Sequence, residues 1–233
     1  MVDWSKILDD ILDSAFSKKH NVTTTLSPNI SKYNGEKVLV FKTSIIEPND
    51  QFQGIITGDL ARKFREKYLI SKNFFYIDRD DAENDPSYKQ VIPYCFITKE
   101  NELFYYERSK KGSEERLHNL FSVGVGGHIN PCDKNNSETI GAACKRELDE
   151  EIEYTNFIGG NFIGLINDDS NLVSSVHFGV VFNIQLKANG EVKPKENKLI
   201  NSSFLSINNL DEQGINWENW SQLLITNYIK NIS

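Results

Sequence analysis

Apolar residues recur along the chain at two spacings, which together predict a mixture of helices and strands. The clearest helical stretch is 137–152, where Ile140, Cys144, Leu148 and Ile152 follow at steps of four and share one face. Further helices are predicted over residues 2–19, 59–67 and 217–229. Short apolar runs predict strands at residues 38–41, 91–98, 103–106, 121–125, 162–166, 176–186 and 204–207. Strands around a central helix, with a closing helix, indicate a mixed α/β or α+β domain.

Polar stretches divide the chain further. Residues 20–36 are rich in Asn, Ser, Thr and Gly and predict a linker, while the charged residues 79–90, which include Pro86, predict a loop. The amphipathic helix at 2–19 is expected to pack on its own domain, and the alternative is that it forms a dimer or binds a partner. We expect an N-terminal helix and linker over residues 1–36, followed by one domain over residues 37–233. The first part of that domain, residues 37–90, is an N-terminal elaboration.

Composition narrows the class of protein. The chain has 233 residues, with 26 Lys and Arg against 33 Asp and Glu, and a formal net charge of −7. This balance argues against a long nucleic acid as partner, although a local basic patch can still bind a small anion. No apolar run approaches the roughly 18 residues of a membrane-spanning helix, and the chain begins without the pattern of a secretory signal. We therefore expect a cytoplasmic protein with no membrane partner. The three widely spaced cysteines form no Cys-x-x-Cys pair, so they predict neither a disulfide framework nor a zinc site.

The helix predicted over 137–152 carries an unusual acidic face. Glu147, Glu150 and Glu151 lie three or four residues apart, so their carboxylates share one side of the helix. Like charges at this spacing repel by a few tenths of a kcal/mol per pair, a cost that a hard dication such as Mg²⁺ would reverse. Arg146 lies four residues before Glu150 and is expected to hold that carboxylate by paired hydrogen bonds. Taken alone, the same residues fit a solvent-exposed acidic face.

Two further features before this helix point to a ligand site. Gly126 and Gly127 follow a predicted strand, where small residues let the backbone approach a ligand and turn a carbonyl toward a metal. A basic cluster precedes the glycines, and its guanidinium groups are suited to grip phosphate; a polar hairpin loop is an equally good interpretation. His128 and His177 are candidates to contact a substrate or to brace the site. The basic cluster consists of Arg108, Lys110, Lys111 and Arg116.

At this point the sequence resembles the Nudix hydrolase family. The family signature reads Gly, five residues, Glu, seven residues, then Arg-Glu-apolar-x-Glu-Glu-x-Gly-apolar. Here Glu138 lies seven residues before Arg146, and residues 146–151 match at every specified position. Two departures stand out: ten residues separate Gly127 from Glu138, and Glu153 replaces the late glycine. Because the intervening loop is longer than the signature's, either Glu138 or Asp133 is a candidate for the early acidic position.

The wider sequence around the signature is also similar to a bacterial Nudix subgroup, described as predicted MutT-type phosphoesterases. The resemblance covers roughly residues 36–230 and leaves the helix at 2–19 outside. It implies a Nudix-like α/β/α sandwich with a mixed sheet, plus an N-terminal helical extension. The implied activity is metal-dependent attack of water on a small diphosphate compound, usually a nucleoside derivative, as in a pyrophosphohydrolase. Apart from the resemblance, the extended N-terminal segment fits a homodimer, and the sequence leaves the oligomeric state open.

The resemblance also implies roles for individual residues. Glu147, Glu150 and Glu151 would hold Mg²⁺, with Mn²⁺ as an alternative, Gly126 would offer its carbonyl, and Arg146 would orient the carboxylates. A later acid would act as base or ligand, with Glu196 the leading candidate and Asp168 or Asp169 the alternatives. Substrate contacts would come from Arg108, Lys110, Arg116 and His128. Two rival functions are a Nudix-like module that binds a ligand without cleaving it, and an isomerase of the isopentenyl-diphosphate type that uses a catalytic cysteine.

Overall fold

The computed structural model describes residues 32–109, 119–133, 139–195, 199–210 and 214–231. The helix predicted at 2–19 lies outside these residues. So do five of the side chains considered above: Lys110, Lys111, Arg116, Glu138 and Glu196.

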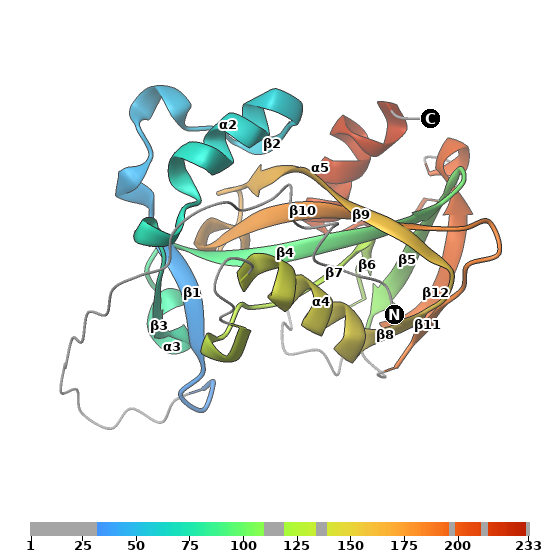
Figure 1. Ribbon diagram of the computed structural model, residues 1–233, viewed down its shortest axis with the longest axis horizontal. Coiled ribbons are helices and arrows are strands. Elements are labelled where there is room, and N and C mark those ends of the chain that lie inside the picture. Colours follow the sequence, from blue (N-terminus) through green and yellow to red (C-terminus); the bar gives the residue numbers. More distant parts are fainter. Residues whose placement is uncertain (1–31, 110–118, 134–138, 196–198, 211–213, 232–233) are drawn as a thin grey trace.

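A ten-stranded mixed sheet forms the centre of the protein (Figure 1). The β4–β10 pair is parallel and the other pairs are antiparallel. The main path through the sheet runs β12 (Leu199–Ser206), β5 (Glu102–Arg108), β4 (Tyr88–Lys99), β10 (His177–Leu186), β9 (Phe157–Asn167) and β2 (Gly54–Thr57). Four strands join it from the side: β1 (Lys37–Lys42) on β4, β3 (Phe75–Asp78) on β1, β6 (Phe121–Ser122) on β5 and β7 (Gly124–Gly126) on β4. A separate two-stranded ribbon pairs β8 (Ile152–Tyr154) with β11 (Val192–Pro194).

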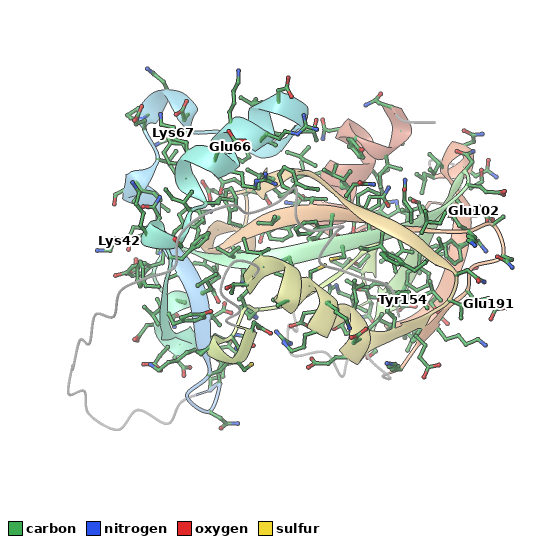
Figure 2. The ribbon with its side chains drawn as sticks, viewed as in Figure 1. Lys42, Glu66, Lys67, Glu102, Tyr154 and Glu191 are labelled. Carbon is green, nitrogen blue, oxygen red and sulfur yellow. The ribbon has the colours of Figure 1, made fainter. Side chains whose placement is uncertain are left out.

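Four α-helices and several short 3₁₀ turns complete the described structure. Charged side chains such as Lys42, Glu102 and Glu191 lie around the outer edge of the molecule (Figure 2). The helices are α2 (Gly58–Tyr68), α3 (Arg79–Ala82), α4 (Thr139–Glu151) and α5 (Asn219–Asn227). The 3₁₀ turns are η1 (Thr43–Ile45), η2 (Pro48–Asp50), η3 (Ser71–Asn73), η5 (Pro131–Asp133), η6 (Ser174–Val176), η7 (Ile207–Asn209) and η8 (Ile229–Asn231). Within the described part of the chain, no helix combines the length and apolar character that crossing a membrane requires.

Helices cover both faces of the sheet, because the central strands are apolar on both sides. Along β4, Cys95 and Ile97 belong to one buried cluster, while Tyr94 and Phe96 belong to another. Successive side chains of a strand point to opposite faces, so the two clusters lie on opposite sides of the sheet. The first cluster includes the apolar stripe of α4 and the second includes α5 (Figure 1). The expected α/β/α sandwich with a mixed sheet is confirmed.

Helix α4 is the element that the sequence predicts best. Its stripe of Ile140, Cys144 and Leu148 is buried, as the spacing requires. Ile152 is also buried but belongs to β8, because the helix ends one residue earlier, at Glu151. The predicted helix over 217–229 begins at Asn219, because the Glu218 carboxylate accepts hydrogen bonds from the backbone amides of the first turn and caps the helix.

Two expectations about local structure are wrong, and two short strands of the main sheet were not predicted. The segment 79–90 is not one loop, because it contains α3 and because β4 begins at Tyr88. Arg79 stabilises α3 by pairing with Glu83, four residues later, and it also pairs with Glu36. The strand expected at 121–125 is two short strands, β6 and β7, that pair with different neighbours. The strands β2 and β3 were not expected, because they are only four residues long and half-buried throughout, without clear alternation.

Candidate active site

The guanidinium of Arg146 organises the acidic face of α4. Its Nη1 donates to Glu147 Oε1 at 2.8 Å and to Glu150 Oε2 at 3.2 Å. The expected pair of hydrogen bonds to Glu150 is not formed. The paired bonds run instead to Asp133, from Nε to Oδ1 at 2.7 Å and from Nη2 to Oδ2 at 2.9 Å. These carboxylates, Asp133 first, raise the pKa of Arg146 against the opposing effect of burial, so its charge is permanent.

Asp133 reaches Arg146 from η5, inside the loop that is longer than the Nudix signature allows. Only 3% of its side chain is exposed, and Oδ2 also accepts the backbone amide of Asn130 at 2.8 Å. Arg146 Nη2 donates in addition to the carbonyl of His128 at 2.9 Å. Asp133 therefore connects the middle of the long loop to α4. Of the two candidates for the early acidic position, Asp133 is the one that the described structure places against Arg146.

The glycine pair is required for close packing rather than for an unusual backbone angle. A Cβ on Gly126 would lie 1.9 Å from the carbonyl oxygen of Pro93 in β4. A Cβ on Gly127 would lie 2.5 Å from the carboxyl carbon of Glu147. Because neither glycine has a side chain, β7 can pack closely against β4, and the Glu147 carboxylate can pack against the backbone that follows β7.

The carboxylates of α4 differ in their surroundings. The Glu147 side chain is 12% exposed, whereas that of Glu150 is 55% exposed. Burial raises the pKa of Glu147, and the Arg146 guanidinium only partly opposes that effect. Because Arg146 must balance Asp133 as well as these glutamates, the site carries excess negative charge. A cation would compensate it.

A cavity of about 900 Å³ opens beside this face of α4. Seven of the predicted site residues line the cavity: Arg108, Gly126, His128, Arg146, Glu147, Glu150 and Glu151. A volume of this size is in the range of small-molecule and cofactor sites.

Arg108, at the end of β5, contributes a cation to the cavity wall. Its Nε is buried and has no hydrogen-bond partner within the described residues. Burial works against the charge, but Tyr106 and the carboxylates of Glu218 and Glu151 outweigh it, so the pKa lies above the ordinary value of arginine. Arg108 is therefore a permanent positive charge on the wall that also holds the α4 carboxylates, which suits recognition of an anion.

Sequence reasoning missed a second group of cavity residues, around the start of α5. Glu218 is 5% exposed and accepts hydrogen bonds from the hydroxyl of Tyr94 at 2.5 Å and that of Ser221 at 2.6 Å. Trp220 packs edge-on against Tyr94, with 5.5 Å between ring centroids, and its buried Nε1 has no hydrogen-bond partner within the described part. The sequence held little signal for these residues, since glutamate is not among the preferred helix caps.

His128 meets His177 and Glu83 at another part of the cavity wall. The Nε2 atoms of the two histidines are 3.2 Å apart, and Glu83 Oε1 lies 3.9 Å from the first and 3.8 Å from the second. Burial, together with Arg79, His177 and Arg146, holds the pKa of His128 well below its usual range. Its imidazole is therefore neutral at pH 7. Glu83 comes from the segment that was expected to be a loop, and the sequence offered no reason to single it out.

The alternatives for the late acidic residue do not line the cavity. Asp169 pairs with Lys89 at 2.5 Å and with Gln53 at 2.6 Å. Asp168 accepts a hydrogen bond from Asn219, which itself lines the cavity. The role assigned to Glu196 falls outside the described residues.

Comparisons with known proteins concern the sequence and the fold as a whole. The chain is 37% identical over 180 residues to Protein YmaB of Bacillus subtilis (strain 168), a match that covers 75% of this chain and 87% of YmaB. Its fold is similar to the crystal structure of Tm1382, "a putative Nudix hydrolase", with 28% identity and a TM-score of 0.68. That match covers 85% of this chain and 100% of Tm1382. No protein-family model matches the chain.

Proposed function

The chain belongs to the Nudix hydrolase family, and from that premise we propose that it is a metal-dependent hydrolase of small organic diphosphates. The proposed reaction is attack of water on phosphorus in a diphosphate linked to another moiety, such as a nucleoside. One observation carries the proposal: the carboxylates of α4 line a large cavity and are positioned there by Arg146 and by the absence of a side chain at Gly127.

The donor atoms on α4 fit a hard dication. Glu147, Glu150 and Glu151 offer only oxygen atoms, which Mg²⁺ prefers, and Mn²⁺ accepts the same ligands. The burial that raises the pKa of Glu147 supports this assignment, because it disfavours the bare carboxylate more than the Arg146 pair stabilises it. Such an ion, once bound, would neutralise charge on the phosphates and lower the pKa of its water. The carbonyl of Gly126 is a further proposed ligand.

The chain's own residues would bind and orient the substrate. Arg146 keeps Glu147 and Glu150 in place through Nη1. Arg108 is proposed to bind a phosphate group from the cavity wall, and Lys110 and Arg116 from the following segment. His128 is proposed to contact the substrate from the same cavity. Glu196 is the proposed general base, with Asp168 and Asp169 as alternatives.

The alternative of a non-catalytic binding module rests on the lengthened loop before α4. That loop places Asp133 on Arg146 without removing Glu147, Glu150 or Glu151 from the cavity. The signature acids are therefore available for catalysis, and hydrolysis is the better supported function. The isomerase alternative needs a catalytic cysteine, and the cavity lining contains none of the three cysteines, two of which are buried elsewhere.

The test is a mass-spectrometric screen of organic diphosphates with Mg²⁺ and with Mn²⁺. We expect metal-dependent release of phosphate-containing products by the wild-type protein. Glu150→Gln should lower turnover by roughly 100-fold or more, since a metal contributes several kcal/mol to such a transition state.

The matched control is Asp149→Asn, which removes a neighbouring acid that is exposed on the same helix and paired with Lys145. Turnover by this variant should stay close to wild type. Saturable binding of a diphosphate by the wild-type protein, without turnover under either metal, would instead establish the binding module.

A further inference from the structure

We propose that Glu83, His128 and His177 form a second metal site, distinct from the α4 carboxylates, which binds a divalent transition-metal ion of the zinc type. The three residues come from separate parts of the chain: Glu83 follows α3, His128 follows β7, and His177 begins β10. Each offers one ligand atom, and the three atoms lie within 4.8 Å of one another.

The distances between the ligand atoms match the size of such an ion. The Nε2 atoms of the histidines are 3.2 Å apart, and Glu83 Oε1 is 3.9 and 3.8 Å from them. A point equidistant from all three atoms lies roughly 2.1 Å from each, which is the length of zinc bonds to imidazole nitrogen and to carboxylate oxygen. No displacement of the backbone is needed to bind the ion.

A hydrogen bond behind His177 holds that ligand in the required form. Nδ1 of His177 lies 2.6 Å from the carbonyl oxygen of Val173. A carbonyl only accepts, so Nδ1 carries the proton and Nε2 presents its lone pair toward Glu83 and His128. A backbone carbonyl behind the imidazole is typical of metal-bound histidines. Arg79 Nε donates to Glu83 Oε1 at 3.3 Å, and the second lone pair of that oxygen remains available for an ion.

The site is buried, and its charge is compatible with a dication. The side chains of Glu83, His128 and His177 are 7%, 13% and 9% exposed. The nearby Arg79 cation does not exclude a metal, because Glu36 pairs with it at 2.9 Å. Together Arg79, Glu36 and Glu83 carry a net charge of −1, which a bound dication would reverse to +1. Without a metal, a buried carboxylate would face two imidazoles with only Arg79 to balance it.

The two proposed sites differ in the ions they select. Imidazole nitrogen suits zinc and similar transition metals, whereas the all-oxygen face of α4 suits Mg²⁺. His128 and His177 line the same cavity as the α4 carboxylates. With three protein ligands, the ion keeps a coordination position for water or for an oxygen atom of a ligand in that cavity.

The test uses the whole protein, stripped of metal by a chelator and then titrated with ZnCl₂ in the presence of excess MgCl₂. Isothermal titration calorimetry and elemental analysis should find one tightly bound zinc per chain that excess Mg²⁺ does not displace. X-ray absorption should show two imidazole ligands at about 2.0–2.1 Å. Glu83→Gln and His177→Gln should each weaken zinc binding at least tenfold.

Glu150→Gln is the matched control, because it alters the α4 face and leaves the Glu83, His128 and His177 ligands in place. It should retain the tight zinc. If Glu83→Gln and His177→Gln both bind zinc as wild type does, or if the wild-type protein binds none, the proposal is wrong. Thermal unfolding of each variant shows that it is folded, and His128→Gln provides a third variant should one fail to fold.

This proposal does not depend on the proposed hydrolase activity, since zinc binding is measured without turnover. A protein that binds zinc at these residues but hydrolyses no diphosphate would contradict only the proposed function. A Mg²⁺-dependent hydrolase that binds no zinc would contradict only the second site.

Discussion

At Gly127 a hydrogen atom occupies the place where any other residue would have a carbon, and Glu147 uses the space. The Glu147 carboxyl carbon lies 2.5 Å from the position that a Cβ would take. Arg146 holds the same carboxylate through a 2.8 Å hydrogen bond to Oε1. The position of this carboxylate thus depends on two neighbours. Gly127 leaves room for it because it has no side chain, and Arg146 binds it through its charge.

Gly127→Ala should therefore impair catalysis more than stability. The new methyl group would displace the Glu147 carboxylate, and a misplacement of about 1 Å can cost roughly 10- to 100-fold in rate. The flexible end of the Glu147 side chain can move away, so the melting temperature should change little. Steady-state kinetics on a diphosphate substrate, together with thermal unfolding, would measure both effects.

Gly159→Ala is the matched control for that change. Gly159 lies in β9, where a Cβ would have no atom within 4 Å, and its φ is not in the left-handed region. This variant should keep both activity and stability. Equal losses in the two variants would show that the contact between Gly127 and Glu147 has no special importance.

At the scale of elements, η5 and α4 are joined by the bidentate pair between Asp133 and Arg146. The pair closes a loop that is longer than the family signature expects, so the additional residues do not separate Asp133 from the helix. A second connection lies at the other face of the sheet, where Glu218 caps α5 and accepts a hydrogen bond from the Tyr94 hydroxyl of β4. In both connections a buried carboxylate fixes a helix that lines the cavity.

Asp133→Asn should destabilise the protein by about 1–3 kcal/mol, because the amide group leaves the Arg146 guanidinium without one of its acceptors in a nearly buried site. Chemical denaturation would measure the change. Asp149→Asn, which breaks an exposed pair with Lys145, should change stability by less than about 0.5 kcal/mol. A loss of the same size in both variants would mean that the Asp133 pair contributes no more than a surface ion pair.

At the scale of the whole molecule, the negative charge is distributed unevenly. The chain carries a net charge of −7, and part of it is concentrated on α4 beside the cavity, where Arg108 is also located. Because burial raises the pKa of Glu147, this carboxyl binds its proton more tightly in the folded protein than in the unfolded chain. Its stabilising contribution is therefore present below the unfolded pKa and is lost as the pH rises through the folded pKa.

Mg²⁺ should therefore raise the melting temperature more at pH 8 than at pH 5. At the higher pH a bound dication compensates the ionised Glu147, whereas at the lower pH protons compete for the same carboxylate. Thermal unfolding with MgCl₂, against NaCl at equal ionic strength, would measure the difference. Glu147→Gln should reduce this response to Mg²⁺, and an unchanged response would place the ion elsewhere.

The sequence predicted the parts of the site that lie close together in the chain. The stripe of α4 and the motif from Arg146 to Glu151 follow from local spacing and from the family resemblance. Glu83 and Trp220 were out of reach, because Glu83 meets the two histidines and Trp220 lines the cavity only through the packing of α3 and α5 around the sheet. The acceptor of the paired Arg146 bonds was also misassigned, since a residue in an irregular loop has no periodicity to reveal it.

The alternation along β4 has a consequence for how the protein can misfold. A slip of one residue against β10 would exchange Tyr94 and Cys95, so the hydroxyl that bonds to Glu218 would face the apolar core beneath α4. The same slip would move the backbone of Pro93, against which Gly126 packs. Both halves of the cavity would then be lost in one error. A folding intermediate with β4 out of alignment should therefore bind no substrate at all, and partial activity cannot accumulate before this strand pair has formed correctly.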